Sequence, residues 1–441
     1  MIPRAEHCIS RSNISENALK VLYRLQQAGH EAYLVGGGVR DLLLGREPKD
    51  FDVATNATPE EIKRIFRNCR LIGRRFRLAH IFFGPEIIEV ATFRGIAAEG
   101  EEGERRAENG MLIRDNVYGT LEEDAWRRDF TVNSLYYNIQ DYSVVDYVGG
   151  MNDLKAGLLR VIGDPNQRYQ EDPARMLRAV RFAAKLGFRI SPESEQPIFE
   201  QADLLKSLPP ARLFDEICKL FLSGHAVATF EHLRHYGLFE HLFPLTEQSL
   251  SAQEHEFPKT FIVKGLENTD LRVAEDKPVA PAFLFAVLLW EPMRAVIHQK
   301  IQAGARQFQA IQEAADEVLS EQNQHVAISR NIAQQVKEIW LLQARFDMRR
   351  GRRAYEVLAH PRFRAAYDFL LLRQAGEEKD EVAELCRWWT DFQNTDRAGQ
   401  DALLAKTAAK PAAAGTARRR RRRPRRAKGG GEGTAAESKE S

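Results

Sequence analysis

The spacing of hydrophobic residues along the chain changes near residue 190. Before that point, short apolar runs such as 33–35 and 86–93 are typical of strands, and helix-spaced apolar residues lie between them, as in 14–30. Beyond it, apolar positions recur at helical spacing, and no further strand is indicated. The pattern predicts an α+β unit followed by an all-α region.

The segment 33–55, YLVGGGVRDLLLGREPKDFDVAT, carries much of the candidate chemistry in the α+β unit. It reads as a strand, a glycine turn, a short helix at 39–44, a second turn and a second strand. Gly36, Gly37 and Gly38 lack a Cβ, so their backbone N–H groups can approach a ligand closely. The turn faces the beginning of a helix, where phosphate groups bind readily.

Asp50 and Asp52 follow in the second strand of this segment. Side chains alternate along a strand, so both carboxylates leave one face, roughly 6–7 Å apart at Cα. A lone glycine triplet or Asp-x-Asp is usually an ordinary turn, but the combination in one short stretch is more specific. A GxGxxG dinucleotide loop does not fit, because the sequence GGGVRD lacks that spacing. The pair suits two Mg²⁺ ions that hold a nucleoside triphosphate.

Glu89 is a carboxylate within an apolar row. The alternation of 86–93 places it on one strand face with Ile87, Ala91 and Phe93. One interpretation is a polar residue on an edge strand. The other is a third active-site carboxylate beside the two aspartates.

The segment 126–137, WRRDFTVNSLYY, follows a stretch at 95–118 that we expect to be a flexible surface loop. We expect a helix to begin here, with a polar cluster at its start. The cluster consists of Arg127, Arg128, Asp129 and Asn133. In one interpretation it is a solvated helix end with an Arg–Asp pair. In the other it binds a nucleotide, with arginine on phosphate and Asp129 and Asn133 near the ribose hydroxyls.

The segment 164–188 predicts a helix with Asp172 as N-cap and Pro173 in the first helical position. Arg175 and Arg178 lie on one stripe of it. These charges either stabilise the helix through local pairs or read a base. A carboxylate and a guanidinium side by side match the N6 donor and N1 acceptor of adenine. Cytosine offers a similar edge, so the pair alone does not choose between them.

The segment 340–373 interleaves arginine with aromatic residues. A solvated helical hairpin is one interpretation. The other is a surface that follows RNA, with arginine on phosphates and aromatic rings on bases. Candidates for the RNA contacts are Arg349, Arg350, Arg352 and Arg353, together with Arg418, Arg419 and Arg420 of the tail.

Charge is unevenly distributed over the 441 residues. The run 418–428 carries nine positive charges, more than the chain's net +2, so the remainder is net acidic. The Ala-, Lys- and Gly-rich composition after residue 396 predicts a disordered tail that binds polyanions. Four scattered cysteines without metal-ligand spacing favour a reduced, cytoplasmic protein. We expect no signal peptide and no membrane span, because the longest apolar run, 281–290, is too short.

Four motifs in this order resemble class II nucleotidyltransferases of the DNA polymerase beta-like superfamily. They are LVGGGVRDLLLG with DFD, EVATFR at 89–94, RRDFTVNSL at 127–135 and EDPARMLRAVRFAAKLG at 171–187. The resemblance covers about residues 1–395. It implies an α+β fold in which a small mixed five-stranded sheet forms a head, followed by all-α neck, body and leg and by the disordered tail.

The resemblance also implies roles for the residues of the four motifs. Gly36, Gly37 and Arg40 would hold the triphosphate; Asp50 and Asp52 would bind metal, with Glu89 as a further catalytic carboxylate; Arg127, Arg128, Asp129 and Asn133 would contact ribose and phosphate; and Asp172, Arg175 and Arg178 would read the base.

The family has two main bacterial branches, poly(A) polymerases and CCA-adding enzymes. The stretch LIGRRFRLAHI at 71–81, Pro173, the segment ARLF at 211–214 and the arginine-rich C-terminal tail resemble the first branch. There is no His-Asp doublet, so the hydrolase domain of some CCA enzymes is not expected.

The expected organisation is a catalytic head at 1–153, a base-reading neck at 154–225, an RNA-binding body and leg at 226–395 and a disordered tail at 396–441. The expected reaction is template-independent transfer of AMP from ATP to RNA 3′ ends, with two Mg²⁺ ions and release of pyrophosphate, in messenger RNA processing and decay. The partners would be messenger RNA, small RNAs and tRNA. Two alternatives stay open: a CCA-adding tRNA nucleotidyltransferase and a non-catalytic RNA-binding protein.

Overall fold

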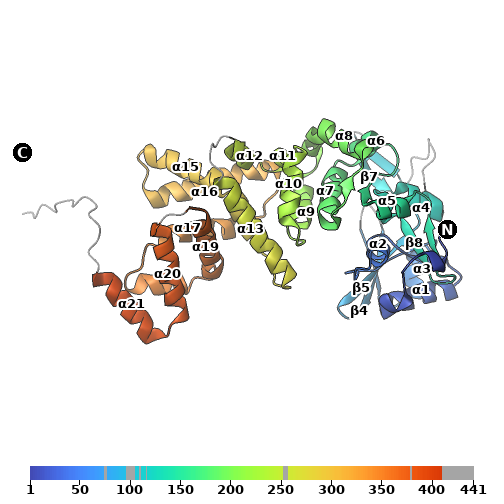
Figure 1. Cartoon of the computed structure of the whole chain (residues 1–441), viewed down its shortest axis with the longest axis horizontal. Coiled ribbons are helices and arrows are strands. Elements are labelled where there is room, and N and C mark those ends of the chain that lie inside the picture. Colours follow the sequence, from blue (N-terminus) through green and yellow to red (C-terminus); the bar gives the residue numbers. More distant parts are fainter. Residues whose placement is uncertain are drawn as a thin grey trace, which may run out of the picture.

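The computed structural model describes residues 1–73, 77–95, 105–108, 111–115, 117–251, 257–377 and 380–409. The molecule is elongated. A mixed α/β head lies at its N-terminal end, and a succession of helices leads away from it (Figure 1). The predicted α+β fold with a helical continuation is confirmed.

The head is built on a mixed seven-stranded sheet, two strands more than the resemblance implied. The strands, in sheet order, are β3 (Cys69–Ile72), β4 (Leu78–Phe83), β5 (Glu86–Thr92), β2 (Asp52–Thr55), β1 (Ala32–Val35), β8 (Leu135–Asn138) and β9 (Val144–Asp146). Within this sheet β2 and β5 run parallel, and all other neighbours are antiparallel.

Two apolar layers hold the sheet. On one face, strand residues such as Leu34 and Val53 pack into a core shared with α1 (Glu16–Gln27), which begins at the N-cap Ser15. The helices α2 (Gly37–Leu43), α3 (Pro59–Ile65) and α5 (Gly150–Ala156) complete the head. On the other face, Val35 and Tyr136 pack in a small cluster against α4 (Leu121–Arg127).

The expected helix at 126–137 is not present. The helix α4 ends at Arg127, a single 3₁₀ turn covers Thr131–Asn133, and the chain then enters β8. Leu135, Tyr136 and Tyr137 are all buried, on both faces of the sheet. Aromatic residues buried on both sides suit an interior strand better than a helix, so tertiary packing overrides the helical pattern.

The stretch 95–118, expected to be a loop, contains a hairpin of β6 (Arg105–Glu108) and β7 (Met111–Asp115). The remainder of that prediction lies largely outside the described residues. The short apolar run 111–113 opens β7, and the glycine and charged residues around it gave no periodic signal in the sequence.

The next helices lead out of the head. They are α6 (Pro165–Glu171), α7 (Ala174–Leu186), α8 (Pro192–Gln201), α9 (Pro210–Phe221) and α10 (Ala226–His235). This part, expected to be all-α, also contains a two-residue parallel pair of β10 (Leu158–Leu159) and β11 (Arg189–Ile190). The pair is too short to leave a periodic signal in the sequence.

The far half is helical throughout the described residues. Its helices are α11 (Phe239–Leu242), α12 (Pro244–Ser251), α13 (Phe257–Ala274), α14 (Pro281–Leu288), α15 (Trp290–Gln302), α16 (Gln307–His325), α17 (Arg330–Arg345), α18 (Arg352–Leu358), α19 (Phe363–Glu377), α20 (Asp380–Asn394) and α21 (Arg397–Ala409). One core cluster runs continuously from the head to Leu372, and a second lies among α17 to α21.

The prediction of disorder from residue 396 is wrong for α21. Its Leu404 is buried in the second core cluster, Asp401 accepts a hydrogen bond from the Tyr355 hydroxyl, and Thr407 accepts one from Trp388. These contacts order an alanine-rich segment whose composition alone suggested disorder. Residues 410–441 lie outside the described part of the chain.

No single helix of the described chain is long and apolar enough to cross a membrane. The helices α14 and α15 pass that test of length and composition only as a pair, bent by 55°. Most of α14 is buried in the protein core.

Candidate active site

The glycine turn between β1 and α2 brings the strand end and the carboxylates together. Gly36 has φ +75° and ψ −136°, a conformation that residues with a side chain rarely adopt. A Cβ on Gly38 would lie 3.2 Å from the backbone oxygen of Asp50. The first glycine therefore permits the turn, and the third lets the segment that carries Asp50 approach it.

Asp52, Glu89 and His80 form a row across three neighbouring strands. Asp52 is the Cα partner of Glu89 in the β2–β5 pair, and Glu89 is the partner of His80 in the β4–β5 pair. Register partners point to the same face on strands roughly 4.8 Å apart. The Nε2 atom of His80 lies 3.1 Å from Oε2 of Glu89. We call Asp52, Glu89 and His80 the carboxylate row.

Asp50 does not share a strand with Asp52, as the sequence suggested. The strand β2 begins at Asp52, and Asp50 is exposed before it. Its charge still acts on Asp52. The pKa of the Asp52 carboxyl is raised to about 6, mainly by burial and also by the charges of Glu89 and Asp50, although the charges of Arg128 and His80 partly offset these effects. Negative charge is thus concentrated at this point of the sheet.

Arg40 is buried beneath the turn and does not reach toward solvent. It is 2% exposed, its Nη2 donates to Oδ1 of Asp41 over 2.7 Å, and its Nη1 donates to Oδ1 of Asn133 over 2.5 Å. Its guanidinium also lies 5.4 Å from the ring centre of Phe182 on α7. The side chain joins α2, the 3₁₀ turn and the neck.

Arg128 lies beside the glycine turn in a polar network. It donates to Asp124 at 3.0 Å and to the Tyr136 hydroxyl at 2.8 Å, and Tyr136 donates to Asp124 at 2.6 Å. These partners hold the pKa of Arg128 above its ordinary value although burial opposes them. The position where Gly36 would carry a Cβ is 3.8 Å from Nη1 of Arg128. A fixed positive charge therefore borders the turn.

Arg127 and Arg168 connect this network to the neck. The side chain of Arg127 donates to the backbone oxygen of Gly95. Nη2 of Arg168 on α6 donates to the backbone oxygens of both Arg127 and Arg128, each over 2.7 Å. Arg168 therefore fixes the position of the end of α4 against the neck.

Asp129 points toward α7. Its Oδ2 lies 2.5 Å from Nη2 of Arg178, and its Oδ1 accepts from the backbone N–H of Phe130 over 3.0 Å. The ribose-contacting and base-reading groups named by the resemblance are thus adjacent in space.

Asp172 closes α6 and does not cap α7 from the expected N-cap position. Pro173 already has helical angles and precedes Ala174, the first residue of α7. The carboxylate forms an ion pair with Arg212 of α9 at 2.8 Å instead of the expected pair with Arg175. It also accepts a hydrogen bond from the backbone N–H of Ala174 over 3.3 Å.

Arg175 is 9% exposed, and its Nη1 donates to the backbone oxygen of Arg168. Burial, with a contribution from the positive charge of Arg168, lowers the pKa of Arg175 to about 10. We call Asp129, Asp172, Arg175, Arg178 and Arg212 the neck charge cluster.

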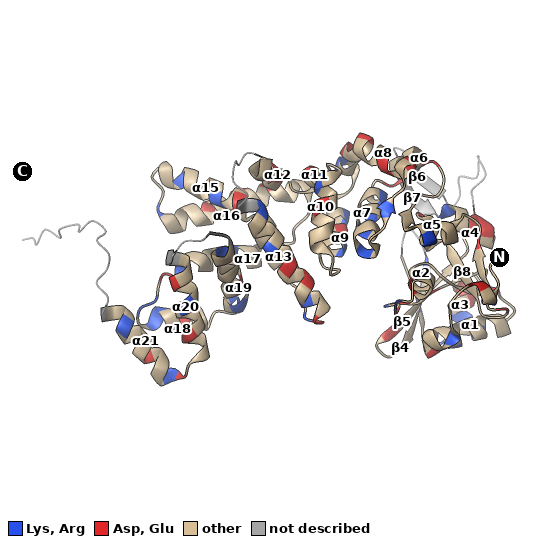
Figure 2. Ribbon diagram, viewed as in Figure 1, with Lys and Arg blue, Asp and Glu red and all other residues tan. Residues whose placement is uncertain are grey.

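The arginines expected to bind RNA lie far from the head. Arg349 pairs with Glu384 over 3.4 Å. Arg350, Arg352 and Arg353 are exposed. Figure 2 shows basic residues along α7 and again near α18 and α21. The tail residues Arg418, Arg419 and Arg420 lie outside the described chain.

Sequence reasoning missed His80, Arg168 and Arg212 as parts of the site. His80 was detectable: a hairpin centred on Gly84 pairs residue 80 with residue 89. Arg212 was noted as a branch feature without a role, and Arg168 gave no signal. Tyr136 was missed because 126–137 was taken for a helix, and Asp124 lies before that segment, in α4.

Within the described residues, no group of three His, Cys, Asp or Glu side chains is arranged closely enough to hold a metal ion by itself. The row nonetheless fits a divalent cation. Asp52 is destabilised as an anion by burial and by two neighbouring carboxylates, and a cation would relieve that cost.

Comparisons with known proteins address the family. Three family models match: the poly A polymerase head domain at residues 32–160, the probable RNA and SrmB-binding site of polymerase A at 187–250, and the polymerase A arginine-rich C-terminus at 303–427. Poly(A) polymerase I of Salmonella typhi is 52% identical over 93% of this chain and 90% of its own length. That of Haemophilus influenzae is 50% identical over 92% and 90%.

CCA-adding enzymes are more distant in sequence but similar in fold. The enzyme of Lactobacillus helveticus is 38% identical over 48% of this chain and 52% of its own length. A solved CCA-adding enzyme of Bacillus stearothermophilus with CTP covers 88% of this chain and 82% of its own, with a TM-score of 0.54 at 24% identity. A tRNA-processing enzyme with CTP covers 88% and 97%, with a TM-score of 0.59 at 23% identity. These structures bear on the fold alone.

The combination of a nucleotidyltransferase head, a helical continuation and half-identical relatives over nine-tenths of the chain leads to one assignment. The chain belongs to the poly(A) polymerase I family, nucleotidyltransferases that polyadenylate RNA.

Proposed function

We propose that the head transfers AMP from ATP to an RNA 3′ hydroxyl at the carboxylate row, with Asp50 as the further acidic ligand and two Mg²⁺ ions as cofactor. The observation that supports this most is the register of Asp52 with Glu89 beside the glycine turn. This register brings acidic ligands next to a turn whose backbone N–H groups can donate hydrogen bonds to phosphate.

In this proposal Asp50 and Asp52 hold the metal ions, and Glu89 lies near the attacking oxygen. When bound, the ions would lower the pKa of the 3′ hydroxyl and neutralise the triphosphate. Gly36 and Gly37 would present backbone N–H groups to the triphosphate. Arg128 would add positive charge at the same place, because its guanidinium borders Gly36.

Arg40 receives a different role from the one that the family resemblance implied. At 2% exposure and held by Asp41 and Asn133, it has no free path to the triphosphate. We assign it to positioning: it orients Asn133 and fixes the turn. Asp129 and Asn133 would then set the location of the ribose from below the turn.

The neck charge cluster would select the base. Arg212 and the backbone N–H of Ala174 fix the Asp172 carboxylate, and the Arg168 carbonyl restrains Arg175. Two restrained groups present one fixed pattern of donors and acceptors, so only one base edge fits well. This rigidity supports selection of a single base, and the poly(A) polymerase relatives indicate that this base is adenine.

The RNA would follow the basic surfaces away from the head, toward Arg350, Arg352 and Arg353, which are exposed. We propose 3′ ends of messenger RNA, small RNAs and tRNA as acceptors. In this proposal residues 1–153 carry out catalysis, residues 154–225 select the base, and residues 226–395 bind RNA. The four cysteines are free of disulfides, which favours a reducing compartment such as the cytoplasm.

The test offers each nucleoside triphosphate separately, with Mg²⁺, to an unstructured RNA and to a tRNA that lacks its 3′ end. Long tracts from ATP alone on both acceptors are the expected result. Addition of C, C and A that stops on tRNA would replace the proposal with CCA synthesis. No pyrophosphate release with any nucleotide would favour a binding protein without catalysis.

A further inference from the structure

One face of the head sheet carries exposed apolar side chains. The strands β3, β4 and β5 pack their other face into the core of the head. On the face that also carries Glu89, Phe82 is partly exposed, and Ile72 and Ile87 are 38% and 42% exposed. Antiparallel strands that face water on one side usually place polar residues there. Neighbouring apolar residues in that position indicate a binding surface.

Phe82 and Ile87 lie next to the carboxylate row. They are Cα partners in the β4–β5 pair, where Phe82 is two residues beyond His80 and Ile87 is two residues before Glu89. Residues two apart on a strand share a face and lie roughly 6–7 Å apart at Cα. The rings of Phe82 and His80 have their centres 6.3 Å apart. The apolar surface is therefore continuous with the row.

Arg70 places a positive charge at the outer end of the same row. It is the Cα partner of His80 in the β3–β4 pair, so it extends the row by one strand. The residue is exposed, and its guanidinium carbon lies 5.7 Å from the ring centre of Phe82. It forms no ion pair with a carboxylate of the described residues. This guanidinium is therefore open to an anion from outside the described chain.

The spacing of these groups matches one nucleotide. A terminal nucleotide has its 3′ hydroxyl and its 5′ phosphodiester at opposite ends of one sugar. Glu89 and Arg70 lie two strands apart, roughly 10 Å at Cα, and the long arginine side chain reduces that separation. A base attached to the same sugar would lie against Ile87 and the exposed part of Phe82. The phosphate and the guanidinium have opposite charges, and the base and the shelf are both apolar in their contact surfaces.

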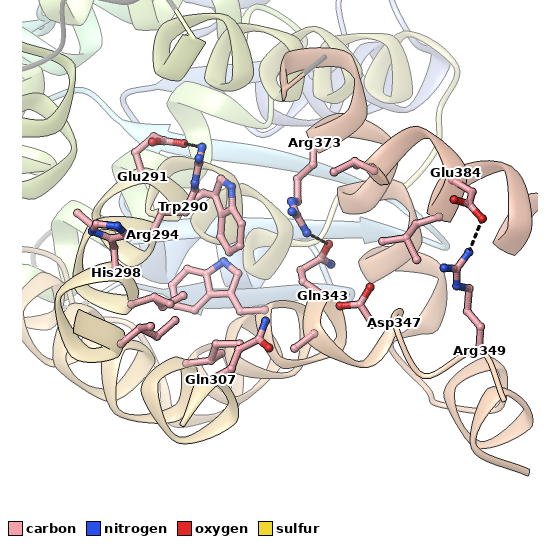
Figure 3. Close-up of a pocket in the computed structure, with 18 residues that line it drawn as sticks. Trp290, Glu291, Arg294, His298, Gln307, Gln343, Asp347, Arg349, Arg373 and Glu384 are labelled. Carbon is pink, nitrogen blue, oxygen red and sulfur yellow. Dashed lines mark hydrogen bonds and ion pairs between the residues drawn. The ribbon is translucent and has the colours of Figure 1, made fainter. Parts of the chain in front are cut away.

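Charged groups in the far half are arranged differently. A cavity of about 850 Å³ among α15, α16, α17, α19 and α20 is lined by Arg294 and Arg349. They form ion pairs with Glu291 at 3.1 Å and with Glu384 at 3.4 Å (Figure 3). A phosphate would have to displace these carboxylates. At Arg70 it would compete only with the contact to the Phe82 ring.

We propose that Arg70, Phe82 and Ile87 form a subsite for the 3′-terminal nucleotide of the RNA acceptor. Arg70 binds the phosphodiester on the 5′ side of that nucleotide, and Phe82 and Ile87 hold its base by apolar contact. The 3′ hydroxyl then lies at Glu89. Apolar contact tolerates every base, so the subsite positions the acceptor without reading its sequence. The inference rests on the proposed function, because it takes the carboxylate row as the place of transfer.

The first experiment removes the charge from each partner of the Arg70 contact. Arg70→Gln is compared with Arg64→Gln, an exposed arginine on α3, the helix whose Ile62 packs into the core on the opposite face of the sheet. The RNA carries a neutral methylphosphonate at its last linkage or, as a control, at a linkage further from the 3′ end. The triphosphate of 3′-deoxyadenosine limits each reaction to one addition. The KM values for RNA and for the nucleotide are measured, together with kcat.

Arg70→Gln should raise the KM for RNA about 5- to 10-fold, the loss expected for one exposed charge-assisted contact, and leave the KM for the nucleotide unchanged. Arg64→Gln should behave as the unmodified chain does. The methylphosphonate at the last linkage should raise the KM of the unmodified chain by a similar factor. It should affect Arg70→Gln little, because both changes remove the same contact.

Three results would overturn the inference. They are an unchanged KM for RNA in Arg70→Gln, additive effects of the variant and the methylphosphonate, and a change confined to the KM for the nucleotide, which would reassign the surface to the incoming nucleotide. The proposed function fails separately, when the unmodified chain adds no AMP to any RNA. Transfer by the unmodified chain together with an unaffected Arg70→Gln refutes the subsite alone.

A second experiment tests the apolar contact. With the unmodified chain, RNAs that end in A, C, G or U should differ less than about threefold in KM, and an RNA whose last nucleotide lacks its base should have a KM about 5-fold higher. Ile87→Ala should reduce that penalty, whereas Leu271→Ala, at a 61% exposed leucine of α13, should keep it. A strong preference for one terminal base, or equal use of the abasic end by the unmodified chain, would overturn the apolar subsite.

Discussion

The carboxylate row and the neck charge cluster lie next to each other but distribute charge in opposite ways. In the row, Asp52 is surrounded by Glu89 and Asp50, and burial with these neighbours raises its pKa to about 6. In the neck charge cluster, acidic side chains are matched by arginine, as Asp172 is by Arg212. In the row like charges are gathered, whereas in the cluster each carboxylate already faces an arginine. In our proposal the row binds metal ions and the cluster selects the base.

The largest effect on AMP transfer is expected from a substitution of Asp52 in the carboxylate row. Asp52→Ala removes a metal ligand that is worth several kcal/mol of transition-state stabilisation, so AMP transfer should fall more than about 100-fold. RNA affinity should persist, because the arginines of the far half are untouched. Single-turnover transfer and RNA anisotropy measure the two quantities, with Asp203→Asn on the exposed neck surface as control. Near-normal transfer by Asp52→Ala would remove the row from the mechanism.

Asp52 should also make the stability of the protein depend on pH, because it is buried near other carboxylates. The folded-state pKa of Asp52 is raised from 3.8 to about 6, so the folded protein binds this proton more tightly than the unfolded chain. Stability is therefore lost as pH rises from about 4 through 6, by up to about 3 kcal/mol. Asp52→Asn should raise the melting temperature of the metal-free protein at pH 8 and change it little at pH 4. Added Mg²⁺ should stabilise the unmodified chain more than the variant. An equal melting temperature of the two proteins at pH 8 would contradict this account.

A third prediction concerns the ion pair between Arg212 and Asp172 in the neck charge cluster. Arg212→Ala leaves Asp172, 8% exposed, without its ion-pair partner. Since Arg212 is itself one-third exposed, the cost in stability should be about 1–3 kcal/mol. Without this pair the Asp172 carboxylate should be held less firmly and accept more than one base, so the preference for ATP over CTP should fall about 10-fold.

Competition between the two nucleotides on one RNA primer checks this, and Lys219→Gln on the same helix is the matched control. Unchanged discrimination would show that Arg212 supports the fold without shaping the base site.

The smallest expected effect concerns His80. Its hydrogen bond orients Glu89, which is otherwise 42% exposed and free to rotate. His80→Gln alters a bond worth about 1 kcal/mol, so kcat should fall about fivefold with KM for ATP unchanged. Steady-state kinetics against His325→Gln provide the comparison. A change confined to KM would mean that His80 contacts substrate instead of positioning Glu89.

The sequence predicted the row better than the cluster. One of the two interpretations of Glu89 set it beside the aspartates, and the β2–β5 register does pair it with Asp52. The shared strand expected for Asp50 and Asp52 is not present, because β2 begins at Asp52. The cluster depends on Arg212, which lies 40 residues from Asp172 and meets it only through helix packing. No periodicity encodes such contacts. The helix prediction for 126–137 was wrong for a related reason. The burial of this segment on both sides depends on neighbouring strands, whereas the local pattern suggested a helix. For the same reason, the core contacts that order α21 could not be read from its composition.

The single parallel pairing in the sheet, between β2 and β5, also constrains how the protein is made. The antiparallel pairs β3–β4, β4–β5 and β8–β9 can form as local hairpins, but the parallel pair must wait for the intervening residues 56–85 to be synthesised and to cross over. A slip of one residue in that late step would turn Glu89 to the opposite face. In the proposed mechanism the site is therefore complete only after the crossover segment has folded in register, and a chain that ends before β5 carries the glycine turn and both aspartates without Glu89.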